Sequence, residues 1–153
     1  MNIVFLDVDG VLNNIGTTDI SMINCCCGID DKNLEQLKRL INETHSKIVL
    51  SSDWRLDDDL EKFLISRLSE HGLSIYDKTP NLHKYDERGE EIKTWLRKHS
   101  DISSWIVLDD MVFRDFSKYE ITDRLVLTNE ECGLTENDVE KAIDIIRGRK
   151  RDA

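Results

Sequence analysis

The sequence predicts an α/β fold in which helices cover both faces of a mainly parallel, five-stranded sheet, giving three αβα layers. Short, nearly continuous apolar runs recur along the chain, as is typical of strands buried on both faces. Segments with apolar residues at helical spacing separate these runs, and this alternation indicates βαβ units. A chain of 153 residues can bury a core of its own, so we expect residues 1–153 to form one domain.

The first predicted strand, residues 3–6, is apolar throughout and leads into two carboxylates, Asp7 and Asp9, with Gly10 directly after them. Because side chains alternate along a strand, Asp7 and Asp9 leave it on the same side, and Gly10 allows a sharp turn beneath them. The remaining apolar runs predict strands at residues 47–50, 73–76, 105–108 and 125–127.

Four segments between and after the strands have the spacing of amphipathic helices. They are a helix capped by Asp30 or Asp31, a helix that ends near Gly72, a helix at about 90–99 and a last helix capped by Thr135. In the last helix, Asp138 stands at the third helical position, where it can complete a loose capping box with Thr135. Residues 14–30 show no clear period and predict a loop or small flap.

The formal net charge of −10 limits the range of partners. Such a chain is poorly suited to broad, non-specific binding of nucleic acid or of an anionic membrane, although a local cationic pocket could still grip one phosphate. No apolar run is long enough to span a bilayer, and no basic region precedes the first strand. We therefore expect no signal peptide, no membrane partner and a cytoplasmic location.

The four cysteines predict neither a disulfide nor a zinc site. Three are consecutive, at 25–27, and adjacent cysteines rarely meet disulfide geometry with each other. The fourth, Cys132, is far away in the sequence, and the separated pairs typical of zinc sites are absent. We expect reduced thiols.

Polar side chains follow three of the predicted strands at the point where each strand ends. The pairs are Asp7 and Asp9, Ser51 and Ser52, and Asp109 and Asp110. In parallel sheets, ligands bind beyond the carboxyl ends of the strands, so these pairs mark one candidate site. Two carboxylates as close as Asp7 and Asp9 are hard to keep ionised without a cation, and Mg²⁺ is the natural oxygen-binding cation.

These strand ends resemble the signatures of the haloacid dehalogenase (HAD) superfamily of phosphohydrolases. The first signature, D-x-D-G-[TV], stands at residues 7–11, the second ends the apolar run 48–50 in Ser51, and the fourth ends the run 106–108 in Asp109 and Asp110. The resemblance covers nearly the whole chain in the right order. It implies a Rossmann-like three-layer αβα sandwich with a minimal cap, here residues 14–30.

The resemblance also implies roles for the strand-end residues. Asp7 would be the nucleophile that forms an aspartyl-phosphate, and Asp9 would be the general acid and then the general base. Mg²⁺ would be held by Asp7, by the backbone carbonyl of Asp9 and by Asp109, with Asp110 more often ordering a metal-bound water. Ser51 would hydrogen-bond a phosphoryl oxygen.

The resemblance further implies a basic residue at or just before the start of the third predicted helix, where it would neutralise the phosphate. Lys84 and Arg88 are both candidates, and Arg88 is preferred because it stands at the helix start. Ser52 and Arg55 are further substrate-binding candidates, since a guanidinium suits bidentate contact with a second phosphate. Trp54 could stack on a base, although a tryptophan in the core or at the rim of the site is the favoured interpretation.

A short cap leaves an open site, which suits a phosphate displayed on something large, such as a nucleic-acid end, a phosphoprotein or a loosely held nucleotide. The chain is also loosely similar to polynucleotide phosphatase domains. The leading hypothesis is a magnesium-dependent phosphomonoesterase. The alternatives are a phosphate- and metal-binding module with little turnover and a phosphotransferase, and the sequence predicts no oligomeric state.

Overall fold

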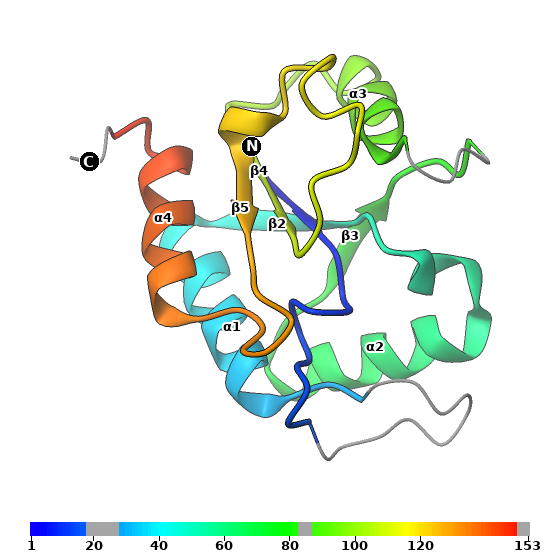
Figure 1. Cartoon of the computed structure of the whole chain (residues 1–153), viewed down its shortest axis with the longest axis vertical. Helices are drawn as coiled ribbons and strands as arrows, with labels where there is room; N and C mark the ends of the chain where they lie inside the picture. Colours follow the sequence, from blue (N-terminus) through cyan, green and yellow to red (C-terminus); the bar gives the residue numbers. More distant parts are fainter. Residues whose placement is uncertain (18–27, 83–86, 150–153) are drawn as a thin grey trace.

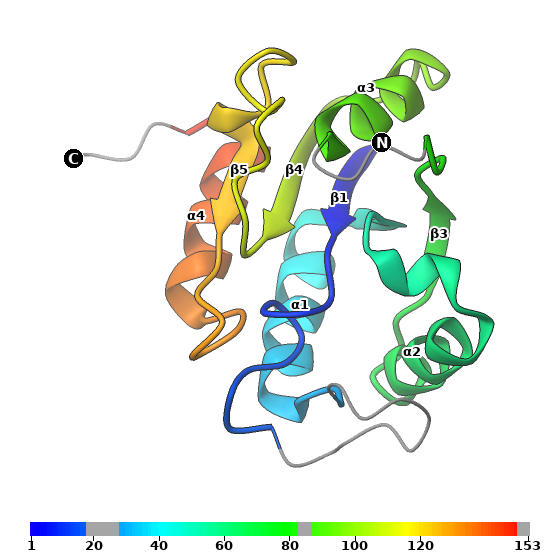
Figure 2. The same ribbon diagram turned by 45° about the vertical axis from the view of Figure 1, so that its right-hand side comes forward.

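The computed structural model describes residues 1–17, 28–82 and 87–149 of the chain. Its centre is a sheet of five strands in the order β3-β2-β1-β4-β5, and every neighbouring pair is parallel. Figures 1 and 2 show this sheet from two directions. The strands are β1 Asn2–Leu6, β2 Ser46–Leu50, β3 Ile75–Lys78, β4 Ser104–Asp109 and β5 Leu125–Leu127.

Helices cover both faces of the sheet. They are α1 Asp31–Thr44, α2 Asp58–Glu70, α3 Arg88–Arg97 and α4 Glu136–Ile146, with the short 3-10 helices η1 Asp53–Leu56 and η2 Thr122–Arg124. Side chains of α1, α2 and α4 pack into one hydrophobic cluster, whereas α3 and the segment after β4 pack into a second cluster. The predicted three-layer αβα, Rossmann-like architecture is therefore confirmed.

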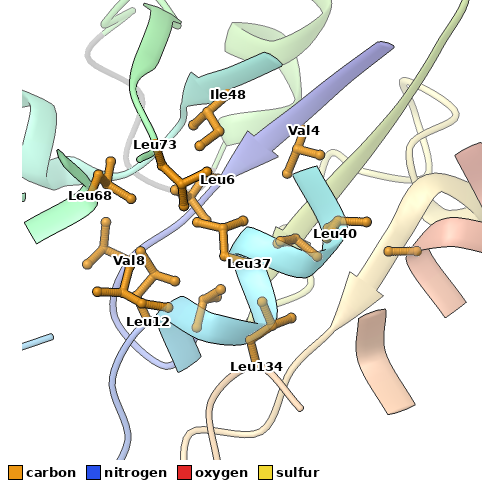
Figure 3. Packing of buried hydrophobic residues seen from close by; sticks show 14 of the residues in the cluster. Val4, Leu6, Val8, Leu12, Leu37, Leu40, Ile48, Leu68, Leu73 and Leu134 are labelled. Atoms are coloured by element: carbon orange, nitrogen blue, oxygen red, sulfur yellow. The ribbon is translucent and has the colours of Figure 1, made fainter. Parts of the chain in front are cut away.

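Strand β1 divides the two clusters because its side chains alternate between the faces of the sheet. Val4 and Leu6 belong to the cluster on the α1 side, and Ile3 and Phe5 belong to the cluster on the α3 side. All four are fully buried. Figure 3 shows Val4 and Leu6 pointing toward Leu37 and Leu40 of α1. A strand buried on both faces explains the unbroken apolar run in the sequence.

Two helix ends match the capping predictions. The side chain of Asp30 accepts a hydrogen bond from the backbone N–H of Lys32 at 2.8 Å, so Asp30 is the N-cap of α1. Thr135 and Asp138 form a reciprocal capping box at the start of α4.

Strand β3 was predicted at 73–76 and lies at Ile75–Lys78 instead. Leu73 closes the end of α2: its N–H donates to the carbonyl oxygen of Leu68 at 2.9 Å, beyond Gly72 in a left-handed conformation with φ of 72°. Leu73 therefore packs in the core at the end of α2 and is not part of β3.

Two further expectations concern segments that lie partly or wholly outside the described residues. Residues 18–27 of the predicted flap at 14–30, with the cysteines at 25–27, are outside them, as is Lys84. The cap assignment and the single domain over residues 1–153 stay predictions. Cys132 is exposed and free. Among the described residues, no helix combines the length and the apolar character needed to cross a bilayer.

Candidate active site

The candidate site lies where β1, β2 and β4 end side by side. Leu6 of β1 pairs in register with Leu50 of β2 and with Leu108 of β4. The next residue of each strand therefore stands at the same level, which brings together Asp7, Ser51 and Asp109. Two backbone hydrogen bonds continue the register past the strands, from Asp7 N–H to Leu108 at 3.0 Å and from Ser51 N–H to Leu6 at 2.8 Å.

A cavity of about 200 Å³ opens at this edge of the sheet. Its lining consists of Asp7, Asp9, Ser52, Asp53, Arg88, Asp109, Asp110, Met111 and Phe113. Most of the residues that the sequence singled out therefore face one pocket, and Ser51 lies directly beside it in the chain.

Three carboxylates in this cavity form a candidate divalent-cation site. Asp7, Asp109 and Asp110 each offer an oxygen atom, and these atoms lie within 4.8 Å of one another. Asp7 and Asp109 are buried and Asp110 is half-buried. Buried carboxylates at such spacing are a donor set that hard cations such as Mg²⁺ prefer, so the residues present fit the predicted metal.

The protonation of two of these carboxyls reflects their environment. Burial raises the pKa of Asp7 well above its usual range, the charge of Asp109 raises it further, and the guanidinium of Arg88 opposes the rise. Burial likewise raises the pKa of Asp109 to about 6, again against the influence of Arg88. A bound cation would favour the ionised form of both groups.

Gly10 is required by the close approach of Asp110. A Cβ atom at position 10 would lie 2.3 Å from Oδ2 of Asp110, and the backbone there has φ of 76°. The carbonyl of Gly10 accepts a hydrogen bond from the hydroxyl of Thr128 at 2.7 Å. The glycine after the second carboxylate therefore gives Asp110 access to the cavity as well as forming the turn.

Arg88, the preferred basic candidate, lies in the middle of the carboxylates. Its Nη1 donates to Oδ1 of Asp7 at 3.2 Å and reaches Oδ2 of Asp109 at 3.5 Å, and its Nη2 donates to Asp53 at 3.3 Å. The guanidinium stacks over the ring of Phe113, 4.6 Å from its centroid. The other candidate, Lys84, lies outside the described residues.

The start of α3, which carries Arg88, is held by a carboxylate from a distant part of the chain. Asp115 accepts hydrogen bonds from the N–H groups of Gly89 at 3.0 Å and Glu90 at 2.9 Å. A Cβ atom at Gly89 would lie 2.8 Å from the carboxylate of Asp115. This cap moves the start of α3 to Arg88 from the predicted position near residue 90, and no local sequence signal marks Asp115.

The two serines after β2 differ in their contacts. The hydroxyl of Ser51 is buried and has no hydrogen-bond partner among the described residues. Ser52 instead accepts a hydrogen bond from the N–H of Trp54 at 3.1 Å and caps η1. A buried hydroxyl without a partner is unfavourable unless a ligand supplies one, and this supports the expected phosphate contact of Ser51.

Arg55, predicted as a substrate-binding residue, makes its contacts within the protein. Its side chain is 3% exposed and forms an ion pair with Glu91 at 2.9 Å. The remaining nitrogens donate to backbone carbonyls, Nε to Thr79 at 3.1 Å and Nη1 to Ser52 at 2.8 Å. These contacts tie the end of β2 to the segment after β3, so they favour a structural role of Arg55 over contact with a second phosphate.

Asp9 differs from the buried carboxylates because its side chain is exposed. Its two oxygens accept hydrogen bonds from Asn13 Nδ2 at 3.1 Å and from Trp54 Nε1 at 3.2 Å. Trp54 is 4% exposed, which matches the expectation of a core tryptophan rather than a base-stacking platform. No pattern in the sequence predicts Asn13 or Trp54 as a partner of Asp9.

Comparison with known proteins gives one informative match. A family described as "HAD domain in Swiss Army Knife RNA repair proteins" matches residues 3–139. The matched range includes every residue that lines the cavity. Neither the curated proteins nor the solved structures searched in the same way gave a match.

Proposed function

The chain belongs to the family of HAD domains in Swiss Army Knife RNA repair proteins, and on this premise we propose that it is a magnesium-dependent phosphatase that acts on a phosphate at an RNA end. The observation that carries the proposal is the convergence of Asp7, Asp109, Arg88 and the unpartnered Ser51 hydroxyl at one sheet edge. The HAD resemblance predicted from the strand-end motifs agrees with this family.

The charges in the cavity support the need for a cation. Five of its lining residues are aspartates, and Arg88 is the one basic side chain among the lining residues. A phosphate dianion entering this cavity would be repelled unless further positive charge were supplied. Asp7, Asp109 and Asp110 would hold Mg²⁺ together with the backbone carbonyl of Asp9, and when bound the ion would neutralise charge on the phosphate.

The chain's own residues would divide the reaction between them. A carboxylate oxygen of Asp7 attacks phosphorus, and the bond from phosphorus to the leaving oxygen breaks. Asp9 gives its proton to that oxygen. Asp9, now ionised, takes a proton from the water that attacks the aspartyl-phosphate, so that inorganic phosphate leaves and Asp7 is restored.

Two further groups would bind the phosphoryl oxygens. Ser51 would donate its hydroxyl hydrogen to one oxygen and so gain the partner that it lacks. Arg88 would turn its donors from the carboxylates toward the phosphate, because a guanidinium offers several N–H groups in a fixed plane. Both groups would stabilise the charge that builds up on phosphorus's oxygens.

The size of the cavity supports a large substrate. At about 200 Å³ it is smaller than the clefts of roughly 300–1,000 Å³ that enclose whole small molecules. It suits a phosphoryl group whose remainder lies outside. Together with the RNA repair proteins that carry this family, this favours a phosphate at an RNA end over a free nucleotide.

The proposal is tested with the purified full chain and a panel of phosphorylated substrates. We expect phosphate release in the presence of Mg²⁺ from RNA oligonucleotides phosphorylated at one end, faster than from nucleotides, phosphopeptides or matched DNA oligonucleotides. Chelation should abolish release, and Asp7→Asn should abolish it at any Mg²⁺ concentration. Activity that survives Asp7→Asn, or that ignores the chelator, would contradict the mechanism.

The same experiment separates the alternatives. A preference for phosphopeptides or free nucleotides would overturn the RNA-end assignment, but the assignment of phosphatase activity would remain. A chain that binds Mg²⁺ and phosphate without turnover on any substrate would be a binding module. Transfer of the phosphoryl group to an added alcohol in preference to water would identify a phosphotransferase.

A further inference from the structure

The carboxylate of Asp9 is held at both of its oxygens by side chains from two different segments. Oδ1 accepts a hydrogen bond from Nδ2 of Asn13 at 3.1 Å, within the loop after β1. Oδ2 accepts a hydrogen bond from the indole Nε1 of Trp54 at 3.2 Å, and Trp54 belongs to η1 after β2. An exposed aspartate on a turn would otherwise choose among several rotamers.

Both donors are fixed in place by other contacts. Asn13 is buried, accepts a hydrogen bond from Gly10 N–H at 2.8 Å and donates to the carbonyl of Gly28 at 3.0 Å. Trp54 is buried in the core, where its ring contacts Phe63, and its backbone N–H is capped by Ser52. The position of the indole N–H is therefore set by packing, and the carboxylate of Asp9 must follow it.

We propose that Trp54 is a positioning residue of the phosphatase reaction, whose indole N–H orients the carboxyl of Asp9 toward the oxygen that leaves phosphorus. This inference rests on the proposed function, and it names the residue that sets the geometry of the proton donor. Proton transfer requires hydrogen-bond distance and direction at the reacting oxygen. Each carboxyl oxygen has a second acceptor position, so the hydrogen bonds from Asn13 and Trp54 fix the orientation of Asp9 and still leave a position for the proton that it transfers.

The effect of removing this hydrogen bond should depend on the leaving group. When the bond between phosphorus and the leaving oxygen breaks, a basic alkoxide or phenolate needs the proton from Asp9, whereas p-nitrophenolate is stable enough to leave without it. A misplaced Asp9 should therefore slow the hydrolysis of phenyl phosphate more than the hydrolysis of p-nitrophenyl phosphate. A general loss of packing would slow both hydrolysis reactions by the same factor.

The main test is Trp54→Phe, which keeps an aromatic ring in the core and removes the N–H. We measure kcat/KM with Mg²⁺, because this constant covers the steps up to departure of the leaving group. For phenyl phosphate we expect a loss of at least about tenfold, which is part of the roughly 10²–10⁴-fold that a general acid contributes. For p-nitrophenyl phosphate we expect a loss below about threefold.

The chain offers a matched control in Trp95. Its indole Nε1 also donates to a carboxylate, Asp77, at 2.8 Å, and the residue is 3% exposed. Asp77 lies on β3, outside the cavity lining. Trp95→Phe removes the same kind of hydrogen bond and should change kcat/KM for the two substrates by the same small factor.

A double variant tests whether Trp54 acts through Asp9. In an Asp9→Asn background, adding Trp54→Phe should reduce kcat/KM for phenyl phosphate no further. If Trp54→Phe does not fold, Trp54 is replaced by the benzothiophene analogue of tryptophan, in which sulfur takes the place of the N–H and the shape is kept. The same dependence on the leaving group is expected for that variant.

The outcomes are distinguishable. Equal losses on both substrates, or a further loss in the Asp9→Asn background, would overturn the positioning role while the phosphatase stands. A wild-type chain that hydrolyses neither substrate would overturn the proposed function and the role of Trp54 with it. A loss confined to phenyl phosphate, absent in Trp95→Phe, supports the inference.

Discussion

Arg88 and Asp7 lie 3.2 Å apart at the centre of the cavity, although 81 residues separate them in the sequence. Each side chain is 10% exposed, so this contact between the proposed nucleophile and the proposed phosphate-binding cation is largely shielded from water. A buried charge that loses its partner is costly. The pair therefore keeps the proposed nucleophile and the proposed phosphate-binding cation at one place in the cavity.

Arg88→Lys should reduce phosphatase activity although it keeps the charge. The guanidinium contacts Asp7, Asp109 and Asp53 through separate N–H groups, and a lysine ammonium on a flexible stem cannot reproduce that fork. We expect kcat/KM for p-nitrophenyl phosphate to fall by about 10- to 100-fold, less than the roughly 10²–10³-fold cost of removing a whole charge-stabilising donor, because the positive charge is kept. Steady-state kinetics with Mg²⁺ measure this.

Arg114 supplies the control for that substitution. It also belongs to the region around α3, but its side chain is 70% exposed and paired with Glu87 at 2.9 Å. Exposed pairs of this kind contribute little, so Arg114→Lys should leave kcat/KM within about twofold of wild type. Wild-type activity in Arg88→Lys would contradict the need for the guanidinium fork, because the ammonium group would then serve the phosphate equally well.

Ser51→Ala and Ser52→Ala should separate activity from stability. Ser51 has no hydrogen-bond partner to lose, so Ser51→Ala should leave the free energy of unfolding nearly unchanged while kcat/KM falls by about 10-fold or more. Ser52→Ala removes the cap of η1 and should lower the free energy of unfolding by about 1 kcal/mol. Urea unfolding and kinetics on the same preparations compare the two variants, and a destabilised Ser51→Ala would contradict a role in binding.

The sequence predicts those parts of the site that follow from local pattern and sheet geometry. Asp7, Ser51 and Asp109 each end an apolar run, and parallel pairing in register then places them at one level. The position of Arg88 at the start of a helix was also predictable. These residues share the same position at the ends of parallel strands, and pairing of the strands in register brings them together in space.

Contacts set by tertiary packing could not be predicted in this way. The capping of α3 by Asp115 joins groups 25 and 26 residues apart, and the hydrogen bond from Trp54 to Asp9 spans 45 residues. The guanidinium of Arg55 suits a phosphate as well as it suits Glu91, and only the buried ion pair distinguishes the two. No periodicity or spacing in the sequence encodes such choices.

Asp115→Ala should impair both stability and activity, because one carboxylate fixes the helix that carries Arg88. The substitution leaves the N–H groups of Gly89 and Glu90 without their acceptor. We expect the free energy of unfolding to fall by about 1–3 kcal/mol and kcat/KM to fall as Arg88 loses its position. Urea unfolding and kinetics check the two effects. Asp115→Asn keeps one acceptor oxygen and should restore part of the stability and part of kcat/KM. An Asp115→Ala variant that is both stable and fully active would contradict the link between the Asp115 cap and the position of Arg88.

Without a divalent cation, the carboxylate cluster should make stability fall as pH rises. The pKa of Asp109 is raised to about 6 and that of Asp7 is raised well above its usual range, so the folded chain binds protons more tightly than the unfolded chain. Stability from these groups is therefore full below the unfolded value of about 4 and is lost as pH rises through about 6. For Asp109 the loss is at most about 3 kcal/mol. Thermal unfolding in chelator at pH 5 and pH 7.5 measures it.

Asp109→Asn should remove the share of this dependence that Asp109 contributes in the metal-free protein. The amide removes the buried charge and keeps an acceptor for the N–H of Met111, which Asp109 binds at 3.0 Å. At pH 7.5 in chelator the variant should unfold at a higher temperature than wild type, and at pH 5 the difference should shrink because wild-type Asp109 is then mostly protonated. Added Mg²⁺ should raise the unfolding temperature of wild type more than that of the variant, since the variant has lost an ionised ligand.

The control Asp123→Asn, at an exposed position outside the cavity, should follow wild type under all conditions. A variant less stable than wild type in chelator at pH 7.5 would contradict the conclusion that the buried charge of Asp109 destabilises the metal-free protein.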